Sequence, residues 1–282
     1  MLRWSPILSI LFGLAAGPLA AQAPGIELRV TEGTLALDAT WLPLTDTVYK
    51  IEQRETWLRE LAPAAARAIY GAEHFRGLLP QRAVAVGDVW SIDVDALLPF
   101  LRQLHPGATG DLHHGGGQGV SAPGAYACLR AFDADHAEIT IRAHVDFMLR
   151  GDGKARQTAW FTPAQFAGSL TLDTTRGAVR EFSLAVPDQR ANVDVNLPSE
   201  GHVVADIGRV PKMEVRGGRG HEFGASARQI PVADAAQRLL RAFYPVAQVE
   251  WLDLPTALRT SRETGKPLHV LVLFGSLLDE SC

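Results

Sequence analysis

The sequence lacks most of the features that would assign it to a familiar functional class. It has only two cysteines, and Cys128 and Cys282 lie in regions of different character, so we expect no disulfide between them. The net charge is −4, which gives no electrostatic footprint for nucleic acid. After the N-terminal region no segment is apolar over the roughly 20 residues that a membrane span needs. There is no internal repeat, no G-x-S-x-G elbow, and no phosphate-binding loop, because residues 217–220 (GGRG) are not followed by Lys-Ser/Thr.

The first residues have the three parts of a secretory signal peptide. Arg3 supplies a positive start, residues 7–19 are apolar and uncharged, and small residues follow. Cleavage after Ala23 fits the A-x-A pattern, and cleavage after Ala21 is the alternative. The apolar stretch is short for a membrane anchor and contains Pro18. We therefore expect an exported protein of the periplasm or extracellular space, with no stable membrane anchor after cleavage.

The next part of the chain favours an antiparallel, β-rich domain with flanking helices, an α+β class of fold. Apolar residues alternate with a period of two in segments separated by Gly- and Asp-containing turns. The predicted strands are a pair within 26–50 that turns at Glu32-Gly33, and segments 84–92, 126–131, 137–149, 168–173 and 179–186. Helical spacing predicts an amphipathic helix over 51–69, interrupted near Pro63, and a short helix over 96–104.

Residues 105–124 are rich in glycine and histidine and have no apolar period, which predicts a loop or flap. His105, Asp111, His113 and His114 are of types that bind zinc or copper, but their spacing matches no fixed metal motif. We favour a solvated loop, and we assign no metal ligand and no cofactor from the sequence.

Two further histidines lie in the predicted strands. The period of two places His144 on one face with Arg142 and Asp146, and His136 lies among the acidic residues Asp135 and Glu138. We interpret these residues as the polar outer face of an antiparallel sheet. Cys128, between Ala127 and Leu129, is predicted to be a buried structural thiol.

The composition changes after residue 198. Residues 199–230 are dense in Gly, Arg and Pro and are predicted to be a linker; Arg209, Lys212, Arg216 and Arg219 could contact an anion there, but a solvated role is favoured. Helices are predicted over 233–244 and 254–264, the second stopped by Gly265. The apolar run 267–274 is typical of a buried parallel strand.

The last thirty residues resemble the start of a thioredoxin-like domain. The resemblance rests on Trp251, on Gly265-Lys266-Pro267, on the apolar run after it and on Cys282. It implies that Cys282 is the attacking cysteine, activated at a helix N-terminus where free N–H groups lower a thiol pKa. The Trp that usually precedes this cysteine is absent, and the sequence ends at Cys282, so no resolving group follows it.

This end point suggests that a selenocysteine codon follows Cys282, giving a selenoprotein with a Cys–selenocysteine pair. A truncated chain with an inert tail, or a C-terminus that merely resembles the motif, are the alternatives. The expected parts are a signal peptide at 1–23, a β-rich domain at 24–198, a linker at 199–230 and an incomplete thioredoxin-like segment at 231–282.

Segments 85–90 (AVGDVW) and 161–166 (FTPAQF) resemble uncharacterised bacterial envelope proteins. The expected function is a thiol–disulfide oxidoreductase of the cell envelope, with Cys282 catalytic and the β-rich domain as adaptor. Its partner would be a protein or small-molecule thiol or disulfide. The alternative is a non-enzymatic protein that binds a ligand or partner and carries a vestigial tail.

Overall fold

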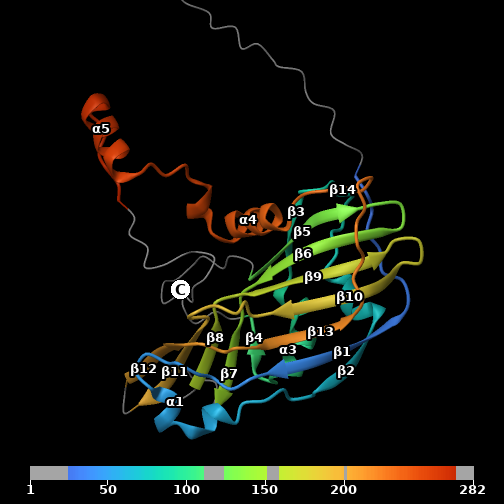
Figure 1. Ribbon diagram of the computed structural model, residues 1–282, viewed down its shortest axis with the longest axis horizontal. Coiled ribbons are helices and arrows are strands. Elements are labelled where there is room, and N and C mark those ends of the chain that lie inside the picture. Colours follow the sequence, from blue (N-terminus) through green and yellow to red (C-terminus); the bar gives the residue numbers. More distant parts are fainter. Residues whose placement is uncertain (1–24, 111–123, 151–158, 200–201, 271–282) are drawn as a thin grey trace, which may run out of the picture.

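The computed structural model describes residues 25–110, 124–150, 159–199 and 202–270, and two antiparallel sheets form most of this part of the chain (Figure 1). The larger sheet has nine strands in the order β14-β5-β6-β9-β10-β13-β1-β2, with β3 paired to β5. The bounds are β1 Thr34–Trp41, β2 Arg67–Gly71, β3 Val89–Ile92, β5 Ala125–Phe132, β6 His136–Ala143, β9 Phe166–Asp173, β10 Ala178–Ala185, β13 Met213–Gly218 and β14 Arg228–Gln229.

The smaller sheet lies at one end of the larger sheet and is ordered β12-β11-β8-β7-β4 (Figure 1). Its strands are β4 Ala108–Thr109, β7 Asp146–Arg150, β8 Ala159–Pro163, β11 Val193–Ser199 and β12 His202–Gly208. The chain crosses between the sheets at His144-Val145, between β6 and β7, and again at Ala164-Gln165, between β8 and β9. The two sheets are therefore continuous through short connections.

Short helices complete the described fold. Their bounds are α1 Ile51–Arg54, α2 Ala72–Arg76, α3 Leu98–Leu104, α4 Val232–Phe243 and α5 Leu254–Thr264, with 3₁₀ turns at Thr56–Arg59, Val94–Ala96 and Pro245–Gln248. Phe100 of α3 lies 4.5 Å from Phe182 of β10 and 5.1 Å from Phe75 of α2, measured between ring centroids. These rings form part of the main core on one face of the larger sheet.

On the opposite face of the same sheet, α4 packs on β5, β6 and β3. Ala127 and Leu129 belong to the main core, whereas Cys128 packs with Ala235 and Leu239 of α4. Successive side chains of a strand point to opposite faces, so this alternation places α3 and α4 on different sides of β5. α5 extends away from the sheets, and none of its residues is buried (Figure 1).

The α+β class and the antiparallel β-rich architecture are confirmed. The strands expected over 126–131, 137–149, 168–173 and 179–186 correspond to β5, β6 with β7, β9 and β10. The helices expected over 96–104, 233–244 and 254–264 correspond to α3, α4 and α5. Gly265 ends α5 in the left-handed conformation, with φ 67°.

The prediction of one amphipathic helix over 51–69 is wrong. The chain instead forms α1, a 3₁₀ turn and then β2, in which the Ile69 side chain is 71% exposed. Leu58 is buried, but β2 pairs with β1, and residues 67–69 take part in that ladder. Pro63 has no backbone N–H and so cannot donate an intrahelical hydrogen bond, and the residues of β2 after it pair with β1 instead.

The segment expected to be a linker, residues 199–230, contributes strands to both sheets. It contains β12, β13 and β14, and β13 lies between β10 and β1 in the larger sheet. α4, expected to belong to the thioredoxin-like segment, packs on β5 and β6. The strand expected over 267–274 is absent from its described part, residues 267–270, where Leu268 and Val270 are exposed. A thioredoxin-like segment is therefore not confirmed.

Candidate functional site

The residue expected to be catalytic, Cys282, lies outside the described residues, as do Asp111, His113 and His114. His105 is described, and its Nδ1 accepts a hydrogen bond from the backbone N–H of Gly107 at 3.1 Å. Burial lowers the pKa of His105, which favours the neutral imidazole. His105 also lies edge-on to Trp41, so it packs at the border of the core.

Cys128 is a fully buried free thiol, as predicted. Burial raises its pKa to about 11; the nearby Arg238 opposes this rise and Asp88 adds to it. The thiolate is the reactive form of cysteine, so Cys128 is a poor nucleophile at neutral pH.

Arg142, His144 and Asp146 share one stretch of chain, but they do not form a solvated outer face. All three are buried at the junction of the two sheets. Arg142 donates from Nε to Nε2 of His144 at 3.0 Å, and Asp146 accepts from Oγ1 of Thr162 at 2.6 Å. The end of α4 covers His144 and Arg142, because Phe243 stacks on His144 and lies 5.8 Å from the Arg142 guanidinium carbon. The interpretation as an outer face is therefore wrong, since α4 packs over this part of β6.

The described residues bring one group of candidate ligands together: Asp133, His136 and His221. One side-chain ligand atom from each lies within 4.8 Å of the others. Asp133 is in the connection between β5 and β6, His136 begins β6, and His221 is in the segment between β13 and β14. The two imidazole rings are stacked, with centroids 3.9 Å apart and planes 14° apart.

Asp133 is the centre of this group. Its Oδ2 lies 2.7 Å from Nε2 of His221, and its Oδ1 accepts the backbone N–H groups of Asp135 and His136 at 3.0 and 2.8 Å. Burial alone would raise the Asp133 pKa, but the bonds from Asp135, His221 and His136 outweigh it and lower the pKa below its usual value. Asp133 is therefore a carboxylate at neutral pH.

The turn at Asp133 and the position of His136 in a strand follow from the sequence, but the role of His221 does not. Asp133 and His221 are 88 positions apart, and the strand pairings on both sides of His221, β13 with β10 and β14 with β5, bring them together. No local spacing signals such a pair.

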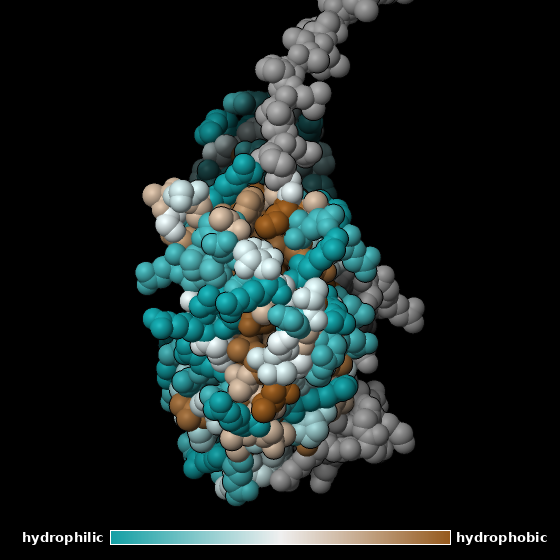
Figure 2. Space-filling view, turned by 90° about the vertical axis from the view of Figure 1, so that its right-hand side faces the viewer, coloured by the Kyte–Doolittle hydropathy of each residue, from teal (hydrophilic) through white to brown (hydrophobic). Residues whose placement is uncertain are grey.

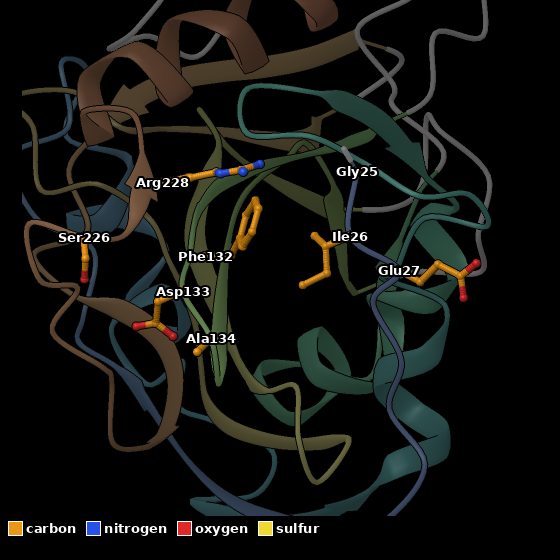
Figure 3. Close-up of a pocket in the computed structure, with 8 residues that line it drawn as sticks. All are labelled: Gly25, Ile26, Glu27, Phe132, Asp133, Ala134, Ser226 and Arg228. Carbon is orange, nitrogen blue, oxygen red and sulfur yellow. The ribbon is translucent and has the colours of Figure 1, made fainter. Parts of the chain in front are cut away.

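A groove of about 730 Å³ opens beside this group. Its lining comes from the start of the described chain, from the end of β5 and the β5–β6 connection, and from the start of β14 and the segment before it: Gly25, Ile26, Glu27, Phe132, Asp133, Ala134, Ser226 and Arg228. Figure 3 shows Ile26 and Phe132 facing each other, with Arg228 extended above the Phe132 ring and the Asp133 carboxylate turned away from Ile26. The Arg228 guanidinium carbon lies 5.5 Å from that ring centroid.

The outer surface beside the strand hairpins carries no single broad apolar area. On the face shown in Figure 2, apolar residues form small separate areas between hydrophilic side chains. Within the part of the chain that is described, no helix has the length and apolar character of a membrane span.

The chain is similar along its length to selenoprotein N. It is 26% identical to selenoprotein N of Homo sapiens over 348 residues, covering 100% of this chain and 58% of the human protein. It is 26% identical to the Mus musculus protein and 27% identical to the Danio rerio protein, covering 89% and 80% of this chain. The chain spans about half the length of these curated relatives. No protein-family model and no solved structure matches it. These similarities link the chain to selenoproteins.

Proposed function

We propose that this chain is the β-rich part of an exported thiol–disulfide oxidoreductase in which Cys282 attacks the substrate disulfide. The observation that supports the proposal is the similarity of the whole chain to proteins named selenoprotein N. Selenoprotein relatives, together with a cysteine in a thioredoxin-like sequence context, favour a Cys–selenocysteine pair at residues 282 and 283. The signal sequence favours an oxidising compartment, where such a pair meets disulfide substrates.

The proposed reaction is a two-step exchange. The Cys282 thiolate attacks one sulfur of the substrate disulfide, forms a mixed disulfide and releases the other sulfur as a thiolate. The adjacent selenolate then attacks the Cys282 sulfur, so that the enzyme becomes a selenenylsulfide and the second substrate thiolate is released. The substrate gains two electrons, and an external thiol must reduce the enzyme pair before the next turnover.

The gene gives the most direct test of the pair. We expect codon 283 to be UGA, followed by a frame that completes a thioredoxin-like domain. A stop codon without such a frame, or a sense codon for a residue that cannot resolve a mixed disulfide, contradicts the proposed chemistry.

The two cysteines provide a matched biochemical test in the protein made from the complete frame. Acceleration of insulin reduction by dithiothreitol should be lost in Cys282→Ser and retained in Cys128→Ala, since Cys128 is buried with a pKa of about 11. Equal activity of the two variants would contradict the role of Cys282.

A second function, ligand binding without catalysis, is favoured by the groove of about 730 Å³. The apolar side chains of Ile26 and Phe132 and the cation of Arg228 suit an amphiphilic anion. The probe anilinonaphthalene sulfonate should bind saturably, and Arg228→Ala should weaken its binding several-fold. The exposed Arg67, which pairs with Asp38 outside the groove, is the control: Arg67→Ala should leave binding unchanged. Binding that does not saturate, or that is equal in all three proteins, argues against this function.

A further inference from the structure

We propose that Asp133, His136 and His221 form a binding site for a divalent transition metal of the zinc type. Two imidazoles and one carboxylate are a ligand set that zinc binds in proteins, and three protein ligands leave a position for water or another ligand. The three residues come from two distant parts of the chain and meet in the described structure. The proposal is independent of the redox role of Cys282.

The spacing of the ligand atoms is close to what a tetrahedral metal requires. Zinc–nitrogen and zinc–oxygen bonds of about 2.0–2.2 Å place ligand atoms roughly 3.3–3.6 Å apart. Nδ1 of His136 lies 3.8 Å from Oδ1 of Asp133, and Nε2 of His221 lies 2.7 Å from Oδ2. A metal would change both distances by less than about 1 Å, although they run to different oxygens of Asp133. The stacked imidazole rings, whose planes lie 14° apart, must also turn so that the in-plane lone pairs of both nitrogens point at one metal.

The backbone holds the central carboxylate in place before any metal arrives. Oδ1 of Asp133 accepts the N–H groups of Asp135 and His136, so the turn between β5 and β6 fixes the direction of the side chain. Such hydrogen bonds to a ligating group are the outer-shell support typical of metal sites. On the other side, His221 packs edge-on to Phe223, with ring centroids 4.7 Å apart. Two of the three ligands are therefore positioned by contacts outside the group.

Metal binding must replace a proton. The 2.7 Å contact between His221 and Asp133 is a hydrogen bond through a proton on Nε2, and in a neutral imidazole that proton must move to Nδ1 before Nε2 can bind a metal.

Arg180 competes with the metal. Its Nη1 lies 3.1 Å from Nε2 of His136, and a guanidinium can only donate, so the imidazole nitrogen accepts. In this arrangement Nδ1 carries the proton and is not available to a metal. Arg180 is exposed, so its side chain can turn into solvent at little cost. Removal of this side chain should therefore strengthen metal binding.

The alternative is that the three residues only fasten the segment between β13 and β14 to the β5–β6 connection by hydrogen bonding and ring stacking. Such a cluster would hold its shape with or without a metal, and it would show no affinity for one. The two interpretations are separated by direct titration.

The experiment first frees the complete chain of metal and then measures its zinc affinity by competition with a chromophoric chelator at pH 7.5. The absorption of bound Co²⁺ then reports the coordination geometry of the metal. His221→Gln and Asp133→Asn are the test variants, since both keep the side-chain shape. His74→Gln is the matched control, because His74 pairs with Glu73 outside the group. The double variant His113→Ala/His114→Ala is the second control, and it tests the histidine-rich segment. Circular dichroism confirms that each protein is folded.

The expected result is one zinc bound per chain and at least tenfold weaker binding in each test variant that folds. Both controls should bind like the parent, and Arg180→Ala should bind several-fold more tightly. The absorption bands of tetrahedral Co²⁺ should appear in the parent protein and be absent in the test variants. The proposal is overturned if the parent binds no zinc, if the test variants bind equally well, or if the His113/His114 variant loses binding.

Discussion

The imidazole of His144 lies flat against the ring of Phe243, with ring centroids 3.6 Å apart and planes 13° apart. His144 is in the connection between the two sheets, and Phe243 is the last residue of α4. Arg142 adds a cationic group 5.8 Å from the same ring. This contact fixes the end of α4 at the junction of the sheets and so sets where the chain leaves the β-rich body.

Substitution of Phe243 should destabilise the protein measurably. Phe243→Ala removes the stacking on His144 and the cation–π contact with Arg142, and we expect a loss of about 1–2 kcal/mol in the free energy of unfolding. Urea denaturation measures the loss. Leu258→Ala on α5 is the control, because Leu258 is in a helix without buried residues, and its effect should stay below about 0.5 kcal/mol. Equal effects of the two variants would contradict the importance of the stacked pair.

The buried thiol of Cys128 should make stability fall at high pH. Its pKa is raised from 9.0 to about 11 in the folded protein, so the unfolded chain ionises first as the pH rises. The stabilisation is complete below about pH 9 and is lost between pH 9 and 11, with a size on the order of 2 kcal/mol.

Urea denaturation from about pH 8 to 11 tests this, with Cys282→Ser as the parent protein so that only one thiol titrates. The Cys128→Ala variant should lose less stability over that interval. If the free energy of unfolding falls equally with pH in the two proteins, Cys128 does not cause the pH dependence.

The carboxylate of Asp133 should stabilise the folded protein at neutral pH and lose this effect in acid. Hydrogen bonds lower its pKa below the ordinary value of 3.8, so its contribution is present above about pH 4 and is lost as the pH falls further. In metal-free buffer, Asp133→Asn should be less stable than the parent by about 1 kcal/mol at pH 7, and the difference should shrink near pH 3. The exposed Asp95 provides the control variant, Asp95→Asn, which should show no comparable change.

Asp206 should be the most sensitive carboxylate of the smaller sheet. It is buried and accepts the backbone N–H groups of Tyr49, Ile51 and Ile207 at 2.9–3.1 Å. Asp206→Ala leaves these donors unsatisfied, and we expect a loss of about 2–4 kcal/mol. Urea denaturation gives the total, and hydrogen exchange at the amides of Tyr49 and Ile51 should accelerate.

Asp188 provides the comparison for Asp206. It forms an ion pair with Arg209 but is 58% exposed, so Asp188→Ala should cost less than about 1 kcal/mol. If the two substitutions have the same effect, the three backbone hydrogen bonds of Asp206 do not determine the conformation around α1.

Some elements of the fold could be predicted because they follow from local pattern. Apolar alternation identified β5, β6, β9 and β10, each of which has a turn signal beside it. Ala235 and Leu239 fall one helical turn apart and face β5, and Gly265 ends α5 where a left-handed residue is needed. In these places the local preference and the tertiary structure agree.

Other elements could not be predicted because distant partners decide them. β13 lies in a stretch rich in Gly and Arg, yet it pairs on both edges, with β1 and with β10. Arg67 to Ile69 continue a helical pattern in the sequence, but β1 draws them into the sheet. Arg142, His144 and Asp146 have the polar character of an outer face, and only the packing at the junction of the two sheets shows that they are buried.

The sequence by itself determined the α+β class, the positions of most strands of the larger sheet and the buried state of Cys128, because these depend on the period and polarity of neighbouring residues. The tertiary structure alone decided which residues meet at the candidate metal site. Asp133 and His221 come together because β13 pairs with β10 and β14 pairs with β5, and these pairings depend on contacts between residues far apart in the chain.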